Sequence, residues 1–273
     1  MGKSQLDGPI GSARNGRMTR SPPPTILATR EGPSAEVLNP GGKSAVCLVC
    51  EHASPRIPNS LSDLGLAAKD RHSHAVWDIG AAEVAKALAD ALDAPLVASR
   101  VSRLVYDCNR NTNAADAMPE CVEKIEVPGN RELSDADRHA RIIQVYVPFR
   151  DLLARTLNTF ASPPILVTIH SFSPTWFGKP RDVEIGLLHD ADDRLAKRML
   201  ASARKGIDTR LNEPYSAADG VMHTLKAHAL PWGLQNVMIE IRNDLISDAA
   251  GAARVASPIA DMLTSALDRE AVP

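Results

Sequence analysis

Four short apolar runs in this chain each adjoin a dense cluster of polar residues, at positions 50–54, 102–110, 169–172 and 239–244. Segments of helical periodicity separate them. One helix is predicted over residues 72–92, where apolar residues recur at spacings of three and four. Strands that alternate with helices indicate a single α/β domain with a mixed, mostly parallel central sheet and helices on both faces. In such a sheet the active site lies outside the carboxyl ends of the strands, where these polar clusters fall.

The same patterns predict the remaining elements. Buried strands are expected over residues 44–50, 95–98, 164–170, 183–188 and 236–241, with another extended piece over 101–106. Further helices are expected over 135–160, 193–210 and 248–267. Ser134 is the expected cap of the first of these, and Pro148 predicts a kink within it. Residues 109–131 are expected to be a polar loop, and residues 212–233 a loop with one helical turn near its middle.

The first 42 residues differ in composition from the rest. They are rich in Gly, Pro, Ser and Arg and show almost no apolar periodicity. Such a segment cannot bury enough apolar surface to offset the entropy of ordering it. We therefore expect a disordered or loosely packed arm over residues 1–42 and one globular domain over residues 43–273.

Charge and composition argue for a small-molecule partner. The 31 Lys+Arg and 33 Asp+Glu give a net charge of -2, so neither nucleic acid nor an anionic membrane is expected to bind. No apolar stretch reaches the roughly 18 to 20 residues of a membrane span, and the N-terminus lacks an apolar signal core. Four cysteines without a secretory signal fit reduced thiols, and the expected location is the cytoplasm.

Two histidines occupy equivalent positions at strand ends. His52 comes two residues after the first buried run, and His170 comes at the end of the run over 165–169. A lone histidine there is commonly an ordinary loop residue. Two of them in matching places favour a shared metal, because neutral imidazole is a preferred zinc ligand.

A catalytic zinc usually takes three protein ligands, so a third donor is needed. Asp78 is the predicted donor, and Glu51, His72 and His74 are its competitors. In the alternative interpretation His72 and Asp78 are ordinary first-turn residues, where the helix dipole favours an aspartate.

An acidic residue interrupts a predicted central strand. Glu240 stands within Val237-Met238-Ile239-Glu240-Ile241, and a buried acid must be compensated or functional. A carboxylate in a dry pocket can act as a general base during the attack of water on an amide. The competing interpretation is a buried ion pair with Arg242, two residues along the same strand.

Arg103, Asn109 and Arg110 surround the predicted chain reversal after Tyr106. The planar guanidinium matches a carboxylate through two parallel hydrogen bonds, and an asparagine amide adds a directed donor. Asp107 could orient one of the arginines. Singly these residues would be surface charge, but grouped at a strand end they favour a site for a substrate carboxylate.

Together these segments resemble the N-formylglutamate amidohydrolase family. The matching stretches are Cys50-Glu51-His52-Ala53-Ser54, His74-x-x-x-Asp78-x-Gly80-Ala81, residues 102–107 with Asn109-Arg110, His170-Ser171-Phe172, residues 212–216 and residues 240–244. The resemblance implies a fold similar to the zinc carboxypeptidases and aspartoacylases. It also implies hydrolysis of an N-acylated acidic amino acid, namely N-formyl-L-glutamate to formate and L-glutamate.

The resemblance also assigns roles to residues. His52, Asp78 and His170 would hold one zinc ion, and Glu240 would be the catalytic base. Asp78 substitutes for a glutamate of the wider group, whose His-x-x-Glu corresponds here to His52-Ala53-Ser54-Pro55. The Asn-Arg pair of the family matches Asn109-Arg110, which would hold the substrate carboxylate together with Arg103. Tyr215 and Arg181 are expected to close over the substrate because they lie on loops rich in Pro and Gly. The alternatives are a related zinc amidase or carboxypeptidase for another N-acyl amino acid or short peptide, and a protein that binds an acidic metabolite without catalysis.

Overall fold

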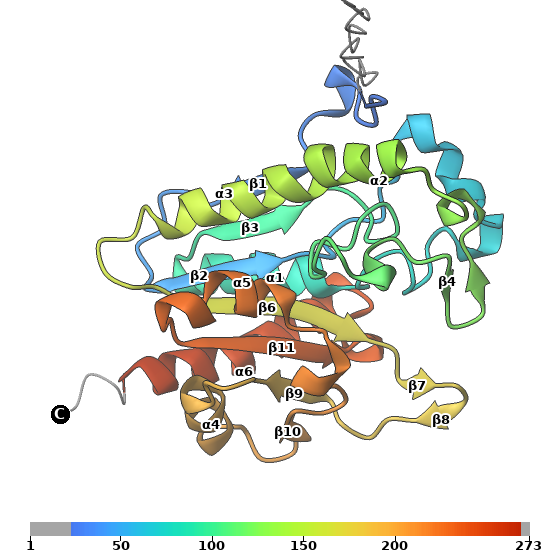
Figure 1. The fold of residues 1–273 in the computed structure, drawn as a ribbon. Coiled ribbons are helices and arrows are strands. Elements are labelled where there is room, and N and C mark those ends of the chain that lie inside the picture. The colour runs from blue at the N-terminus through green and yellow to red at the C-terminus, as the bar shows by residue number, and fades with distance from the viewer. Residues whose placement is uncertain (1–22, 269–273) are drawn as a thin grey trace, which may run out of the picture.

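A seven-stranded sheet forms the centre of the computed structural model, which describes residues 23–268. The strand order is β1-β3-β2-β6-β11-β9-β10 (Figure 1). Strands β3, β2, β6 and β11 run parallel, whereas β1 is antiparallel to β3 and β9 is antiparallel to β11. The bounds are β1 Ala35–Leu38, β2 Val46–Cys50, β3 Leu96–Ser99, β6 Ile165–Phe172, β9 Ile185–Leu188, β10 Thr209–Leu211 and β11 Asn236–Arg242. The predicted mixed, mostly parallel α/β architecture is confirmed.

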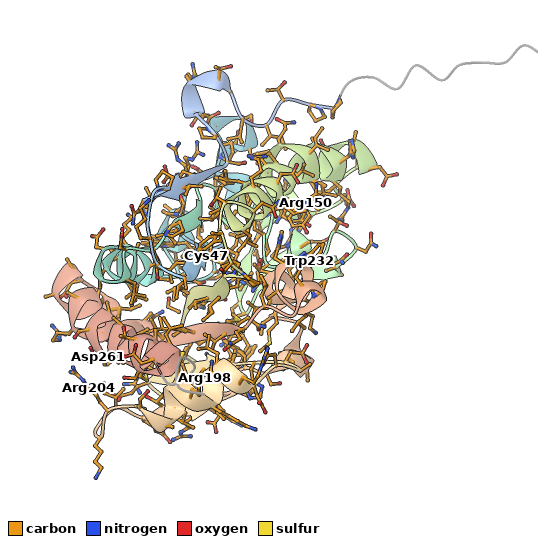
Figure 2. All side chains as sticks on the ribbon, turned by 90° about the vertical axis from the view of Figure 1, so that its left-hand side faces the viewer. Cys47, Arg150, Arg198, Arg204, Trp232 and Asp261 are labelled. Carbon is orange, nitrogen blue, oxygen red and sulfur yellow. The ribbon has the colours of Figure 1, made fainter. Side chains whose placement is uncertain are left out.

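Helices cover both faces of the sheet. One apolar layer packs against α1 (Ala81–Leu92), α4 (Arg194–Ala201) and α6 (Ala249–Asp268), and the other against α3 (Val147–Leu157) and α5 (His223–His228). Within β2, Cys50 faces the first layer and Cys47 the second. Cys47 is fully buried and lies deep inside the molecule in Figure 2. The two thiols therefore do not converge, as the strand period predicts.

Two hairpins project from one end of the sheet. They are β4–β5 (Cys121–Val122 with Ile125–Glu126) and β7–β8 (Thr175–Trp176 with Lys179–Pro180). Both lie at the end toward which β2 and β6 point (Figure 1). Short 3-10 turns occur at Thr29–Glu31, Asn59–Gly65, Ala68–Asp70, Ala115–Ala117, Pro128–Asn130, Ala217–Asp219, Leu230–Trp232 and Asn243–Ile246.

The helix predicted over 135–160 is present in three joined parts. The α2 segment (Asp135–Arg141) continues through a π-helical turn, Ile142–Tyr146, into α3. Ser134 caps it, since its side chain accepts a hydrogen bond from the backbone of Asp137. The π turn comes immediately before Pro148, where the missing N–H interrupts the regular hydrogen-bond ladder.

Three predicted elements differ from the structure. The first helix begins at Ala81, and residues 72–80 form turns. Residues 101–106 form turns in place of a strand, because the Ser102 hydroxyl donates to Val76 O and accepts from the backbone N–H of Leu104. The helix predicted over 193–210 ends at Ala201, and Thr209–Leu211 pairs with β9 as β10. In all three, contacts with distant segments outweigh local propensity.

The expectation of an arm over residues 1–42 was wrong for its second part. Strand β1 is an edge strand of the central sheet, and Ile26 is buried. The backbone N–H of Ile26 donates to Oε1 of Gln144, 2.8 Å away, which fastens this segment to the π turn. Composition alone did not reveal the four residues of β1, because their pairing partners in β3 lie about sixty positions away in the sequence. Residues 1–22 lie outside the described residues.

None of the helices within residues 23–268 has the combination of length and apolarity that crossing a bilayer requires.

Candidate active site

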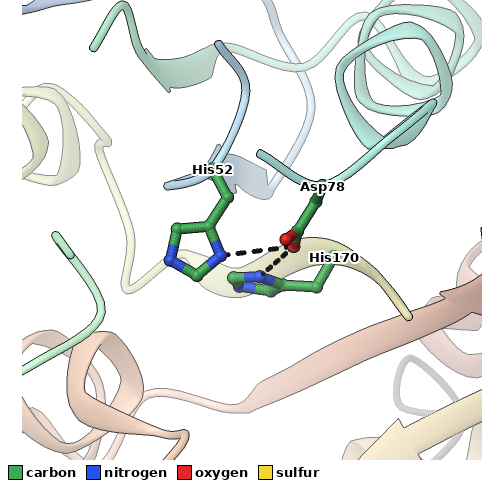
Figure 3. Close-up of side chains that lie close together, drawn as sticks. All are labelled: His52, Asp78 and His170. Atoms are coloured by element: carbon green, nitrogen blue, oxygen red, sulfur yellow. Dashed lines mark hydrogen bonds and ion pairs between the residues drawn. The ribbon is translucent and has the colours of Figure 1, made fainter. Parts of the chain in front are cut away.

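Three buried side chains from distant segments converge at the carboxyl end of the sheet. His52 follows β2, His170 lies in β6, and Asp78 precedes α1. In Figure 3 both imidazoles point at the same carboxylate oxygen, Oδ2 of Asp78, which lies 3.2 Å from Nδ1 of His52 and 2.9 Å from Nδ1 of His170. One ligand atom from each residue lies within 4.8 Å of the others. The structure thus brings together the three residues that were predicted as metal ligands.

Asp78 reaches this point because the chain has not yet entered the helix. Gly80 has a φ of 78°, and a Cβ there would lie 2.1 Å from the carbonyl oxygen of Ile246. Only glycine combines this conformation with such close packing. The carboxylate also accepts a hydrogen bond from the backbone N–H of Ser171, at 3.2 Å. His74 and Asp78 therefore do not lie on one face of a helix, although they are four residues apart.

The competing ligands lie elsewhere. His72 is exposed, and Nε2 of His74 pairs with Glu123 of the β4–β5 hairpin at 2.7 Å. Glu51 is buried on the far side of the His170 ring, where its Oε2 lies 3.1 Å from Nε2. Glu51 therefore faces the nitrogen that points away from Asp78.

Each imidazole of the cluster has a carboxylate behind it. Nε2 of His52 lies 2.7 Å from Oδ1 of Asp107, and Nε2 of His170 faces Glu51. Carboxylates in this position hold a ligating histidine in one tautomer and increase its basicity. Burial alone would lower the pKa of His170, but Glu51 and Asp78 raise it well above its ordinary value.

Arg103 is tied to the same cluster. Its guanidinium donates to Oδ1 of Asp78 at 3.1 Å and to Oδ2 of Asp107 at 2.9 Å. Burial would raise the pKa of Asp78, but the nearby His52, His170 and Arg103 hold it below its ordinary value. Arg103 thus fixes two carboxylates that surround His52, while its side chain also lines the pocket.

Glu240 lies beside His170 on the neighbouring strand. The two residues are register partners of β11 and β6. Glu240 is buried, and among the described residues its Oε2 has no hydrogen-bond partner. Burial raises the pKa of Glu240 to about 7. Arg242 instead pairs with Asp244 and Glu184, so the predicted alternative of a Glu240–Arg242 ion pair is wrong.

A cavity of about 260 Å³ opens onto these groups. Its lining includes the three clustered residues, Glu240, Arg103, Asn109, Arg110, Trp176 and Tyr215. Arg110 donates to Oδ2 of Asp116 at 2.7 Å. The amide of Asn109 is used within the protein, because it donates to Val221 O and accepts from the backbone N–H of Thr224. Arg181 lines an adjoining groove behind Tyr215.

The charges around the cavity fit a divalent cation. Four buried carboxylates lie in or beside the cluster of His52, Asp78 and His170, namely those of Glu51, Asp78, Asp107 and Glu240. Within residues 23–268 the guanidinium that pairs with them is that of Arg103. Two imidazole nitrogens and a carboxylate oxygen are also a donor set that zinc prefers. Both the excess negative charge and the donor chemistry therefore suit a bound metal.

The sequence-based interpretation missed the position of Glu51 behind His170 and the contribution of Trp176 to the cavity. A signal for the second exists in the Trp176-Phe177-Gly178-Lys179 stretch, where Gly178 is typical of a tight hairpin turn. No local signal marks the position of Glu51, because the direction of a side chain after a strand depends on the loop that follows.

The chain is similar to known proteins over most of its length. A family model described as N-formylglutamate amidohydrolase matches residues 44–247. The solved structure of a gene product from Agrobacterium tumefaciens is 46% identical, with 89% of this chain and 98% of that chain covered and a TM-score of 0.87. That of N-formylglutamate amidohydrolase from Ralstonia eutropha is 17% identical, with 88% and 99% covered and a TM-score of 0.61, which shows similarity of fold alone. The comparison with curated proteins finds no match.

Proposed function

Since the chain belongs to the N-formylglutamate amidohydrolase family, we propose that it hydrolyses the amide of an N-acylated acidic amino acid, N-formyl-L-glutamate, to formate and L-glutamate. The observation that carries the proposal is the convergence of His52, Asp78 and His170 beside an unpartnered, buried Glu240. A strongly perturbed carboxylate next to a metal-type cluster in a cavity is typical of a hydrolytic site.

His52, Asp78 and His170 would hold one zinc ion through Nδ1, Oδ2 and Nδ1. When bound, zinc would supply Lewis-acid polarisation of the scissile carbonyl and of the attacking water. With the metal bound, Asp107 and Glu51 would accept hydrogen bonds from the Nε2–H groups of His52 and His170, which would leave each Nδ1 as the ligating nitrogen. Arg103 holds Asp78 and Asp107 in place and limits the repulsion between them.

Glu240 is the proposed general base. Its free Oε2 takes a proton from the water as oxygen attacks the amide carbon, and it then returns that proton to the leaving nitrogen. A pKa raised toward neutrality suits both steps, because the same group must accept and donate a proton at one pH.

Arg110 is the proposed anchor for the substrate carboxylate, and Arg103 also lines the cavity. Asn109 supports this anchor, because its buried amide joins the backbone next to Arg110 to the segment at 221–224 through hydrogen bonds. Anchoring one end of the substrate orders the amide relative to Glu240, which lowers the entropic part of the barrier.

The proposal is tested with a panel of N-formyl and N-acetyl amino acids and a short peptide, assayed with zinc and after its removal by a chelator. N-formyl-L-glutamate should give the highest kcat/KM, and activity should return when zinc is restored. Equal turnover of all substrates would favour a broader zinc amidase. Binding of acidic metabolites with no turnover would instead favour a non-catalytic binding protein.

Glu240→Gln should lower kcat by at least about 100-fold, because general-base catalysis contributes roughly 10²–10⁴. The variant is nearly isosteric, so its zinc content should equal that of the wild type, as measured by metal analysis of the purified protein. Retention of full kcat would exclude Glu240 as the base.

A further inference from the structure

Three aromatic rings enclose the guanidinium of Arg181. Its Cζ lies 5.4 Å from the ring centroid of Phe172 and 4.9 Å from those of Trp176 and Tyr215. The backbone N–H of Arg181 donates to Pro174 O at 2.8 Å, and its carbonyl accepts from Arg242. Arg181 is thus fixed at the base of the β7–β8 hairpin, and its charged group reaches across to the loop that carries Tyr215.

Tyr215 separates two cavities. Together with Trp176 and Val221 it lines both the catalytic cavity and an adjoining groove of about 670 Å³, and Arg181 lines the groove. Nη1 of Arg181 donates to the hydroxyl oxygen of Tyr215 at 3.1 Å. Because this oxygen accepts from Arg181, its own hydrogen points elsewhere, and Tyr215 also lines the catalytic cavity.

The backbone of the Tyr215 loop is held in place by β9. A Cβ on Gly186 would lie 1.9 Å from the carbonyl oxygen of Glu213, so this glycine lets the loop lie directly against the strand. Gly186 is the register partner of Glu240 on β11. The loop therefore contacts the strand residue that pairs with the proposed base.

We propose that Tyr215 donates a hydrogen bond from its phenolic hydroxyl to the bound substrate, and that Arg181 is the positioning residue that orients this donor without binding the substrate itself. The proposal rests on the function proposed above. Burial and the nearby Glu240 raise the pKa of Tyr215, so the hydroxyl keeps its hydrogen at neutral pH. Arginine suits the positioning role because its plane stacks on rings while its edge donates hydrogen bonds.

The kinetic test compares Tyr215→Phe, Arg181→Met and the double variant. Tyr215→Phe should lower kcat/KM about 10- to 100-fold, as the loss of one donor to the reacting group does. Arg181→Met should produce a similar loss, and the double variant should lose no more than about threefold beyond either one, since both changes remove the same interaction. Losses that multiply would overturn the proposal.

Arg181→Lys and Lys179→Gln complete the series. Lysine retains the charge but not the planar fork, so Arg181→Lys should behave as Arg181→Met does. Lys179 is an exposed cation of the same groove, and its removal should leave kcat/KM unchanged. If Arg181→Lys instead retains full activity, or if Lys179→Gln matches the loss, general charge explains the effect and the proposal is wrong.

A readout without substrate separates this proposal from the proposed function. The ultraviolet titration of Tyr215 is obtained by subtracting the spectrum of each Tyr215→Phe counterpart. Its pKa should rise in Arg181→Met and Arg181→Lys, because a hydrogen-bond donor to the phenolate is lost. Unchanged far-ultraviolet circular dichroism and zinc content verify folding. An unshifted Tyr215 in a folded variant contradicts the proposal even if no acyl amino acid is ever hydrolysed.

Discussion

Glu51 shows how strongly the direction of a side chain decides its chemistry. It directly precedes His52, and the sequence allowed it as a metal ligand. In the structure it is 1% exposed and faces Nε2 of His170, while Nδ1 of that ring points at Asp78. A carboxylate in this place acts through the imidazole, because it fixes the tautomer and increases the electron density at the ligating nitrogen.

Glu51→Gln should therefore weaken zinc binding about 10- to 100-fold, the usual effect of removing such a supporting carboxylate. The affinity is measured by competition with a chromophoric chelator. Glu123→Gln is the matched control, since Glu123 also pairs with a histidine, His74, but at the edge of the cavity. Equal affinities for wild type and Glu51→Gln would show that Glu51 does not support the ligand.

Helix α1 shows how a helix start can build a site. The apolar spacing from Trp77 to Leu92 is helical, yet the helix begins only at Ala81. Gly80 adopts a positive φ, and its Cα packs against the carbonyl of Ile246 from the segment before α6. This contact turns residues 72–80 out of the helix and aims Asp78 at the two histidines.

Gly80→Ala should lower the free energy of unfolding by about 3 kcal/mol, because it adds backbone strain and a clash at once. Zinc affinity should fall as well, since Asp78 moves. Gly178→Ala is the control: it has nearly the same φ, 79°, but nothing lies within 4 Å of the added Cβ. It should cost only about 1 kcal/mol in chemical denaturation. Equal costs would show that packing against Ile246 is unimportant.

The proposed metal would connect three segments that lie far apart in the sequence. Its ligands come from the end of β2, the turn before α1 and the middle of the sheet in β6. These segments lie far apart in the unfolded chain, so the ligand set forms only on folding. Binding must then stabilise the folded protein through mass action.

Free zinc at about 1,000 times its Kd should raise the free energy of unfolding by about 4 kcal/mol. Thermal or chemical denaturation with and without a chelator measures the difference. His52→Ala and His170→Ala should remove the dependence on zinc while leaving the apo protein folded. A zinc effect of the same size in both variants would place the metal elsewhere.

Local patterns were sufficient for much of the architecture and for part of the site. The strands Val46–Cys50, Ile165–Phe172 and Asn236–Arg242 are rich in apolar residues, so their positions were predictable. Strand polarity then implies that His52 and His170 meet at the same edge. Glu240 was recognisable because a charge inside such a run has an energetic cost that demands a reason.

Tertiary contacts decided the parts of the fold and of the site that local sequence patterns did not predict. Strand β1 forms only because β3 offers its edge, and Arg242 pairs with Asp244 and Glu184 instead of Glu240. Arg181 and Tyr215 form a hydrogen bond although 34 positions separate them. Periodicity and residue type report how a segment relates to its own neighbours. Which nitrogen of an imidazole faces a metal, and which arginine supports a tyrosine, depend on partners that folding brings from elsewhere.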